Sequence, residues 1–299
     1  MLEALIERYR QGDRLALTRL LTLAAQGKHL DELWKAAEAG AKKSLTVALT
    51  GSGGVGKSTL VGRLIPFLRQ QDQTVAILAC DPQSPVSGGA LLGDRFRMPS
   101  RPEDDGVFIR SLAAPGGEGA VARHLDLMCR LLASFGFDVV LIETVGAGQG
   151  ETTVRRLVDV VVLLLQPETG DDLQWEKAGI LEVADVIVIH KADLPGAEQL
   201  EAQVRRELGR PAPVVRVSAK AGTGLDELWK AVSACAAQKP VTAAPVPLLQ
   251  LAQHRLAATF EQAQLDPRVQ HLLAAYRAGS IGAEPAAEEL LSLLTADRR

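Results

Sequence analysis

The sequence predicts an α/β fold, a mostly parallel β-sheet flanked by helices, with helical extensions at both ends. From residue 45 onward, short runs rich in Val, Ile and Leu alternate with helical segments. Such near-continuous apolar runs are typical of strands covered on both faces. A glycine-rich turn joins the first run to a helical segment. Residues before about 40 and after about 240 show helical spacing instead.

The first segment, residues 1–43, is expected to be an N-terminal helical extension. Apolar residues such as Leu17, Leu20 and Ala24 recur at helical spacing, and Gly27 is suited to end that helix. A second short helix is expected from about residue 30 to 39.

The second segment, residues 44–239, is expected to form the α/β domain. Ligands of a parallel sheet bind at the carboxyl ends of its strands, so polar residues at those ends are the candidate site. Strands are predicted at 45–50, 74–80, 107–110, 137–143, 158–165, 185–190 and 213–218. Helices are predicted near 58–70, 118–135, 172–182, 198–208 and 224–237.

The third segment, residues 240–299, is expected to be helical. Residues 239–247 contain three prolines and are typical of a stiff linker. Helices are predicted at about 248–264, 267–278 and 285–296.

Composition limits the class of protein. A chain of 299 residues with 47% apolar residues can bury one sizeable core, and a net charge of −3 offers no basic surface for nucleic acid or membranes. Three isolated cysteines indicate a reducing compartment and argue against a disulfide framework or zinc site. The N-terminus does not resemble a signal peptide, and no apolar run is long enough to span a bilayer, so a cytoplasmic location is expected.

The glycine-rich turn matches the phosphate-binding loop Gly-x-x-x-x-Gly-Lys-Ser/Thr. Glycines let successive backbone N–H groups face one anion, and the following helix adds its dipole. Lys57 is expected to reach the β- and γ-phosphates, and the Ser58 hydroxyl to ligate Mg²⁺. The predicted loop comprises Gly51, Ser52, Gly53, Gly54, Val55, Gly56, Lys57, Ser58 and Thr59.

Acidic residues follow two later strands. Asp81 ends one apolar run, and Glu143 ends another with the pattern of a Walker B strand, in which a carboxylate lies near the metal. Asp94, in a glycine-rich stretch, is a further candidate. Gly146 can bring a backbone N–H to the γ-phosphate, and Gln149 is assigned either to positioning the attacking water or to a structural or partner contact.

The base-reading residues are predicted at the ends of the last two strands. His190, Lys191 and Asp193 match the guanine motif Asn-Lys-x-Asp except at the first position. The Asp193 carboxylate can accept hydrogen bonds from guanine N1–H and N2–H₂, which adenine cannot offer. His190 lacks the two-ended amide of Asn. The partner motif, with a backbone N–H for guanine O6, is Ser218, Ala219 and Lys220.

With these motifs assembled, the chain resembles the MeaB/ArgK family, GTPases of the SIMIBI class that associate with adenosylcobalamin-dependent methylmalonyl-CoA mutase. The most specific motifs are Glu-Thr-Val-Gly-Ala-Gly-Gln at 143–149 and Gly-Asp-Asp-Leu-Gln at 170–174. The resemblance covers most of the chain and includes Tyr-Arg-Gln-Gly-Asp-Arg at 9–14 and Ala-Ala-Glu-Glu-Leu-Leu at 286–291.

The resemblance implies a P-loop enzyme that hydrolyses GTP to GDP and phosphate with Mg²⁺. It implies a chaperone that gates cofactor loading or protection of the mutase, through a switch at 170–174 and a homodimer formed by the C-terminal helices. The candidate catalytic residues are Lys57, Glu143 and Gln149, and the resemblance implies that the metal and the switches involve Ser58, Asp81, Asp94 and Glu143.

Two departures and two alternatives accompany this interpretation. His190 replaces the usual Asn, and residues 111–119 replace a more basic loop of the family. A nickel-type metallochaperone of the same class is one alternative, although the five histidines have no ligand spacing. A transport-associated kinase or ATPase is the other, although Ser52 stands where a deviant ATPase loop carries its signature lysine.

Overall fold

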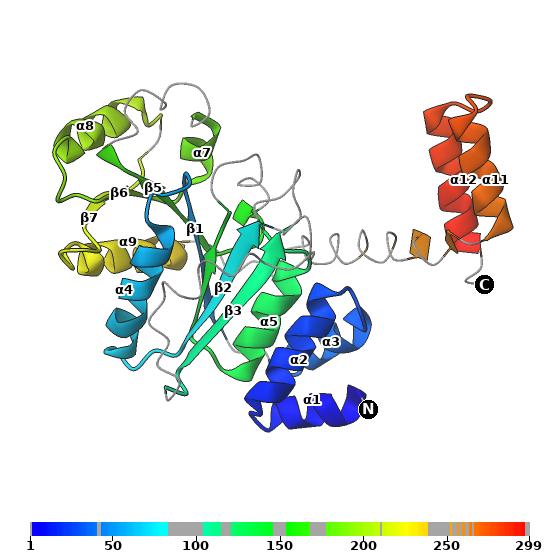
Figure 1. Cartoon of the computed structure of the whole chain (residues 1–299), viewed down its shortest axis with the longest axis horizontal. Coiled ribbons are helices and arrows are strands. Elements are labelled where there is room, and N and C mark those ends of the chain that lie inside the picture. Colours follow the sequence, from blue (N-terminus) through cyan, green and yellow to red (C-terminus); the bar gives the residue numbers. More distant parts are fainter. Residues whose placement is uncertain are drawn as a thin grey trace. The chain divides into compact units, whose positions relative to one another are not determined.

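A computed structural model describes residues 2–40, 43–82, 104–114, 121–145, 154–167, 178–209, 211–238 and 266–296, with isolated positions between 252 and 264. The chain divides into two compact units, Met1–Pro240 and Val241–Arg299. Figure 1 shows the elements of each unit in the colours of the sequence.

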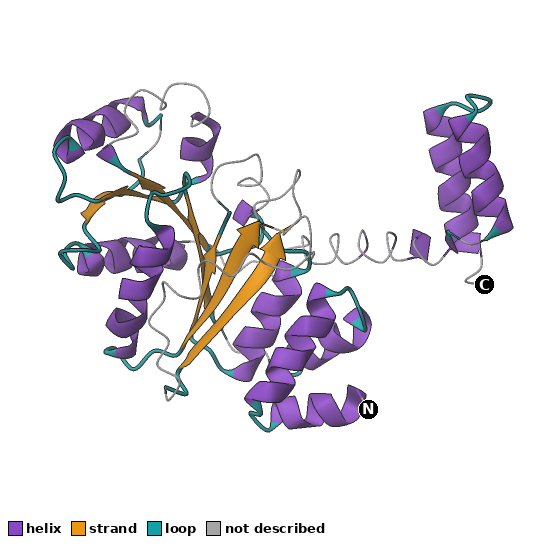
Figure 2. Ribbon diagram, viewed as in Figure 1, coloured by secondary structure: helices purple, strands orange, loops and turns teal. Residues whose placement is uncertain are grey.

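The first unit is built on a parallel sheet, so the predicted α/β class is confirmed (Figure 2). The sheet contains seven described strands in the order β3-β2-β4-β1-β5-β6-β7, and every described strand pair is parallel. Their alternation with helices along the chain leaves the carboxyl ends of all strands at one edge. The strands are β1 Leu45–Thr50, β2 Val75–Pro82, β3 Val107–Ala114, β4 Val139–Glu143, β5 Val160–Leu165, β6 Val186–His190 and β7 Val214–Val217.

Helices cover both faces of the sheet. Apolar residues of α4 and α9 pack with alternate residues of the central strands into one core, whereas α7 and α8 pack on the intervening residues. Because successive strand residues point to opposite faces, these two cores lie on opposite sides. In Figure 1, α5 lies on the side of the sheet opposite α4. The helices are α4 Lys57–Arg69, α5 Leu125–Phe135, α7 Ala178–Val183, α8 Ala197–Glu207 and α9 Leu225–Gln238.

Three N-terminal helices, α1 Leu2–Arg10, α2 Arg14–Ala25 and α3 Leu30–Glu38, belong to the first unit. Helices α2 and α3 contact α5. The buried Tyr9 hydroxyl of α1 donates to the Leu131 carbonyl of α5 at 2.7 Å. Apolar spacing located these helices but not the break at Asp13, whose carboxylate caps α2 by accepting from two backbone N–H groups.

The described part of the second unit is a pair of helices, α11 Pro267–Arg277 and α12 Ala283–Ala296, which contact each other. Asp266 caps α11 by accepting from the Arg268 backbone N–H at 2.8 Å. Two large apolar side chains of this pair are exposed, Tyr276 at 48% and Leu291 at 45%.

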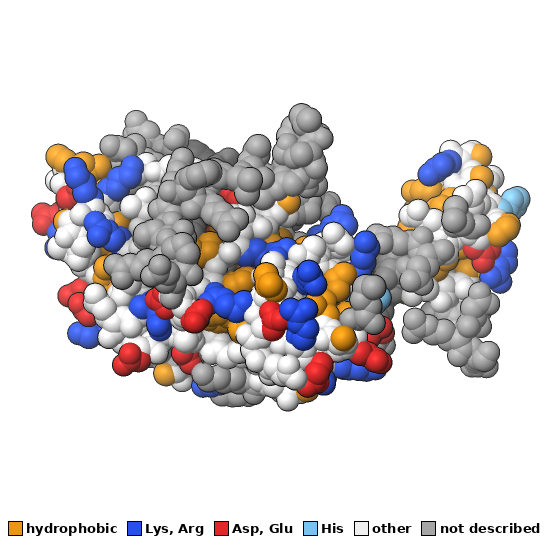
Figure 3. Space-filling view, turned by 60° about the horizontal axis from the view of Figure 1, so that its bottom comes forward, with side chains coloured by type: hydrophobic (Ala, Val, Ile, Leu, Met, Phe, Trp, Pro, Cys, Tyr) orange, Lys and Arg blue, Asp and Glu red, His pale blue; other side chains and the backbone are white. Residues whose placement is uncertain are grey.

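The described surface mixes charges. Figure 3 shows acidic and basic side chains interspersed over the face in view. Among the described residues, no helix combines the length and apolar character needed to cross a bilayer.

Candidate functional site

The phosphate-binding loop lies where predicted, between the carboxyl end of β1 and the start of α4. Two of its glycines are required by the geometry. Gly51 has φ +142°, and a Cβ there would lie 2.5 Å from the Leu164 carbonyl oxygen. Gly56 has φ +101°, and a Cβ there would lie 2.5 Å from Cε1 of His190. Larger residues at these positions would be strained and would clash.

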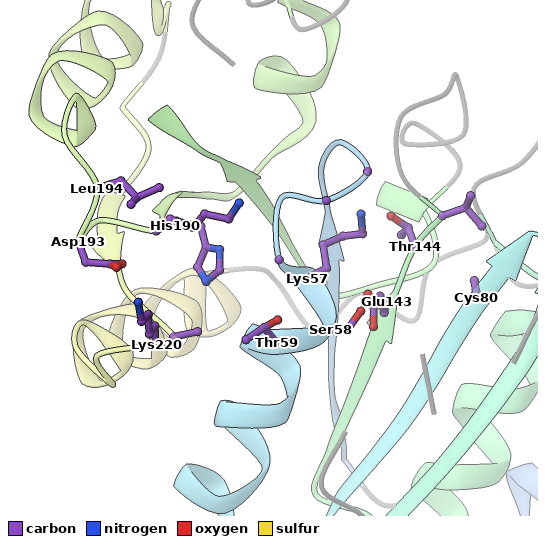
Figure 4. A pocket seen from close by; sticks show the side chains of 16 residues that line it. Lys57, Ser58, Thr59, Cys80, Glu143, Thr144, His190, Asp193, Leu194 and Lys220 are labelled. Carbon is purple, nitrogen blue, oxygen red and sulfur yellow. Dashed lines mark hydrogen bonds between the residues drawn. The ribbon is translucent and has the colours of Figure 1, made fainter. Parts of the chain in front are cut away.

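Lys57 points into this loop (Figure 4). Its ammonium donates to the carbonyl oxygens of Gly51 at 2.9 Å and Ser52 at 3.2 Å, and the side chain is buried. A buried ammonium surrounded by a glycine-rich turn and a helix N-terminus creates a positive potential. The loop is therefore organised to receive an anion.

A hydroxyl and a carboxylate meet beside the loop. The Ser58 hydroxyl donates to Oε1 of Glu143 at 2.6 Å, and both residues are buried. Glu143 of β4 pairs in register with Ala79 of the adjacent strand β2, and the buried Asp81 lies two residues further along β2. Burial raises the pKa of the neighbouring Cys80 thiol to about 12, so this sulfur stays protonated and offers no thiolate.

The opposite end of the site is formed by the ends of β6 and β7. The Ser218 hydroxyl donates to Oδ1 of Asp193 at 2.6 Å, and this hydrogen bond is the main cause of the lowered pKa of Asp193. The carboxylate is thus charged at neutral pH and can accept further hydrogen bonds. Lys191 adopts φ +53° in the turn between His190 and Asp193.

Two contacts at this end do not follow from any motif. Arg63 of α4 donates through Nε to the Ala219 carbonyl at 2.7 Å and thereby fixes the turn after β7. Nδ1 of His190 lies 2.7 Å from the Val55 carbonyl, which ties the end of β6 to the phosphate loop. Arg63 could have been suspected only from its place nearly two helical turns after the loop lysine.

One cavity of about 500 Å³ joins the two ends of the site. It brings together the loop lysine, the Ser58–Glu143 pair and the base-side residues. Four further residues line it that were not predicted as site residues: Cys80, Thr144, Val145 and Leu194. Its predicted lining residues are Gly53, Gly54, Gly56, Lys57, Ser58, Thr59, Glu143, His190, Lys191, Asp193, Ala219 and Lys220. The predicted Asp94, Gly146, Gln149 and the stretch 170–174 lie outside the described residues.

The model of the family described as methylmalonyl Co-A mutase-associated GTPase MeaB matches residues 17–255. A putative GTPase of Pyrococcus abyssi is 42% identical over 240 residues, which is 77% of this chain and 74% of that protein. The mitochondrial methylmalonic aciduria type A homolog of Mus musculus is 39% identical over 227 residues, which is 72% of this chain and 51% of that protein.

Among solved structures, the crystal structure of an LAO/AO transport system kinase aligns with a TM-score of 0.61 at 25% identity. The alignment covers 98% of this chain and 97% of that one. The fold, the phosphate loop and the sequence relatives all indicate a P-loop GTPase. The family match also spans every described residue of the cavity. The chain is therefore a guanine-nucleotide-binding GTPase that belongs to the MeaB family.

Proposed function

We propose that this GTPase is a chaperone that gates cofactor loading or protection of an adenosylcobalamin-dependent mutase of the methylmalonyl-CoA mutase type. The observation that carries the proposal is the match over residues 17–255 to a family described as associated with methylmalonyl Co-A mutase. The name of the mouse relative, which concerns methylmalonic aciduria, points to the same metabolism. The mutase would distinguish the GTP-bound form of this protein from its GDP-bound form.

The chemistry of the site is positioning and charge neutralisation. Lys57 would neutralise the β- and γ-phosphate oxygens, and the loop N–H groups would hold them in place. Gly146 and Gln149 keep their proposed roles at the γ-phosphate and the attacking water. Among the described residues that line the cavity there is no arginine, so slow intrinsic hydrolysis is expected.

A cobalamin mutase should therefore alter the rate of GTP hydrolysis. We expect purified, cofactor-loaded mutase to raise kcat by about tenfold or more, because a partner can complete transition-state stabilisation that the isolated site lacks. Phosphate release with saturating GTP measures this, with the Lys57→Ala variant as background and an unrelated cobalamin-independent enzyme as the matched protein control. An unchanged kcat at saturating mutase would contradict the proposal.

Mg²⁺ fits the side of the cavity where the side chains of Ser58 and Glu143 meet. The Ser58 hydroxyl would ligate the ion, and the carboxylates of Asp81 and Glu143 would hold it directly or through water. These hard oxygen donors suit Mg²⁺, and the protonated Cys80 thiol does not compete. When bound, the ion would neutralise negative charge on the phosphate oxygens.

Removing the Ser58 hydroxyl is expected to weaken this metal. Bound Mg²⁺ slows the release of a fluorescent GDP analogue, and the free Mg²⁺ concentration needed for this effect measures the affinity for the metal. In Ser58→Ala this concentration should rise on the order of tenfold, because losing one metal ligand or its supporting group typically lowers metal affinity by that much. The rate of release without Mg²⁺ provides the control within each protein. Equal Mg²⁺ requirements for the variant and the wild type would remove Ser58 from the metal site.

We also propose that the segment after residue 240 mediates homodimerisation. The exposed Tyr276 and Leu291 of the α11–α12 pair support this role, since a partner would remove their apolar surface from water. Sedimentation equilibrium of the full chain measures the assembly, and a monomer at micromolar concentration would contradict it.

A further inference from the structure

His190 is a buried histidine at the centre of the nucleotide cavity. Its side chain is 3% exposed, and Figure 4 shows the ring between the loop that carries Lys57 and the side that carries Asp193 and Lys220. The ring also packs closely against Gly56, where an added Cβ would lie 2.5 Å from Cε1 and 2.7 Å from Nδ1. Close packing against Gly56 therefore restricts the position of this ring.

The hydrogen bond to the loop settles which nitrogen carries the proton. Nδ1 lies 2.7 Å from the Val55 carbonyl, and a carbonyl can only accept, so Nδ1 donates. In a neutral imidazole the other nitrogen, Nε2, is then an acceptor. Nε2 is buried and has no hydrogen-bond partner among the residues that the structure describes.

Guanine presents the wrong chemistry to this neutral ring. Its N1–H and N2–H₂ groups are the donors expected to meet Asp193, which leaves N7 and O6 on the remaining edge, and both are acceptors. The ring would thus face two acceptors, the Val55 carbonyl on one side and the guanine edge on the other, with a single N–H group. An Asn amide has two N–H groups and could donate a hydrogen bond to each of these acceptors while remaining neutral.

We propose that guanine-nucleotide binding is coupled to protonation of His190, whose imidazolium donates through Nδ1 to Val55 and through Nε2 to the N7 edge of guanine. The inference rests on the proposed guanine pocket and adds a regulatory property to it. At a pH between the pKa of the free ring and that of the complex, one proton enters the protein with each nucleotide and leaves when the nucleotide dissociates.

The charges around the ring set the pH at which this happens. In the described state burial lowers the pKa of His190 and Lys191 lowers it further, whereas the Val55 carbonyl and Asp193 raise it, and burial dominates. Lys57 and Lys220, which also line the cavity, are like charges. The free ring is therefore neutral at pH 7, and an acceptor supplied by the base would raise its pKa on binding.

Because the pKa is higher in the complex than in the free protein, affinity is greatest at low pH. It should fall as pH rises through the window between the two pKa values, by at most about tenfold per pH unit for one proton. Above that window, binding continues without the Nε2–H donor and is weaker.

The experiment is a titration of GDP at pH 6, 7 and 8 on the full-length wild type and on His190→Asn. The Asn amide nitrogen occupies the position of Nδ1 and keeps the donor for Val55, but it does not titrate. The phosphates of GDP also titrate, and the pH dependence of GDP affinity in the variant measures their contribution. The difference in pH dependence between the two proteins is therefore due to His190. In the wild type, the dissociation constant should rise by about fivefold or more from pH 6 to 8 relative to the variant.

A second ligand keeps the test independent of the variant. 7-deaza-GDP retains the phosphates, O6 and the edge that faces Asp193 but carries C–H in place of N7, so its affinity for the wild type should lack the His190-dependent pH slope. GDP binding with identical pH slopes in wild type and variant, or for GDP and 7-deaza-GDP, would overturn the inference while leaving the guanine pocket intact. Equal affinity for GDP and ADP would overturn both.

Discussion

Replacing Lys57 with alanine is expected to lower kcat for GTP hydrolysis by about 10²–10³-fold, a typical effect of removing one preorganised group that stabilises transition-state charge. The buried ammonium lies within the loop, 2.9 Å from the Gly51 carbonyl, where it would meet the phosphates. Nucleotide affinity should fall as well, since the charge also attracts the ground-state triphosphate.

Single-turnover hydrolysis and GDP titration together separate these effects of Lys57→Ala. Lys35→Ala, which removes an exposed lysine from α3, is the matched control and should retain wild-type activity. Thermal unfolding of each variant shows that the fold is preserved. If Lys57→Ala hydrolysed GTP within about threefold of the wild type, Lys57 would not act on the phosphates.

Replacing Asp193 with asparagine is expected to weaken GDP binding by a factor on the order of 10³. A site that recognises its ligand by hydrogen bonds loses much of its affinity when a donor of the protein faces a donor of the ligand. The carboxylate, held by Ser218 at 2.6 Å, can accept from both N1–H and N2–H₂ of guanine. The amide of Asn offers one acceptor and presents its NH₂ group to N2–H₂.

The same substitution should favour xanthine nucleotides, in which a carbonyl replaces the guanine amino group and can accept from that NH₂. Parallel titrations with GDP and XDP measure the exchange of preference, and Asp226→Asn on the exposed start of α9 is the matched control. Unchanged GDP affinity in Asp193→Asn would place the base elsewhere.

Much of the fold could be predicted because the signals are local. Each central strand is a largely apolar run, and the phosphate loop is contiguous in sequence, so both are specified by neighbouring residues. The predicted strand ended at Arg110, whereas β3 continues to Ala114 in register with β2. Polar residues are tolerated there because β3 is the edge strand and Arg110 donates to the Thr18 carbonyl of α2 at 2.9 Å.

The contacts within the site were harder to predict because they join distant parts of the chain. Val55 and His190 are 135 residues apart, and Arg63 and Ala219 are 156 apart. The motif predicted that His190 lies beside the base, but it could not show that Nδ1 of this ring donates a hydrogen bond to the Val55 carbonyl of the phosphate loop. The effect of having His in place of Asn therefore follows only from the structure, in which the single N–H group of a neutral ring would face two acceptors.

The most direct test of the central claim, that this cavity selects guanine nucleotides through Asp193, is a competition of GTP against ATP for the wild-type protein with saturating Mg²⁺ at pH 7. Displacement of a fluorescent GDP analogue gives both dissociation constants under one condition. The geometry predicts that GTP binds more tightly by a factor on the order of 10³ or more, since adenine would leave Asp193 and the turn after β7 without their partners. Equal affinity for the two nucleotides would contradict it.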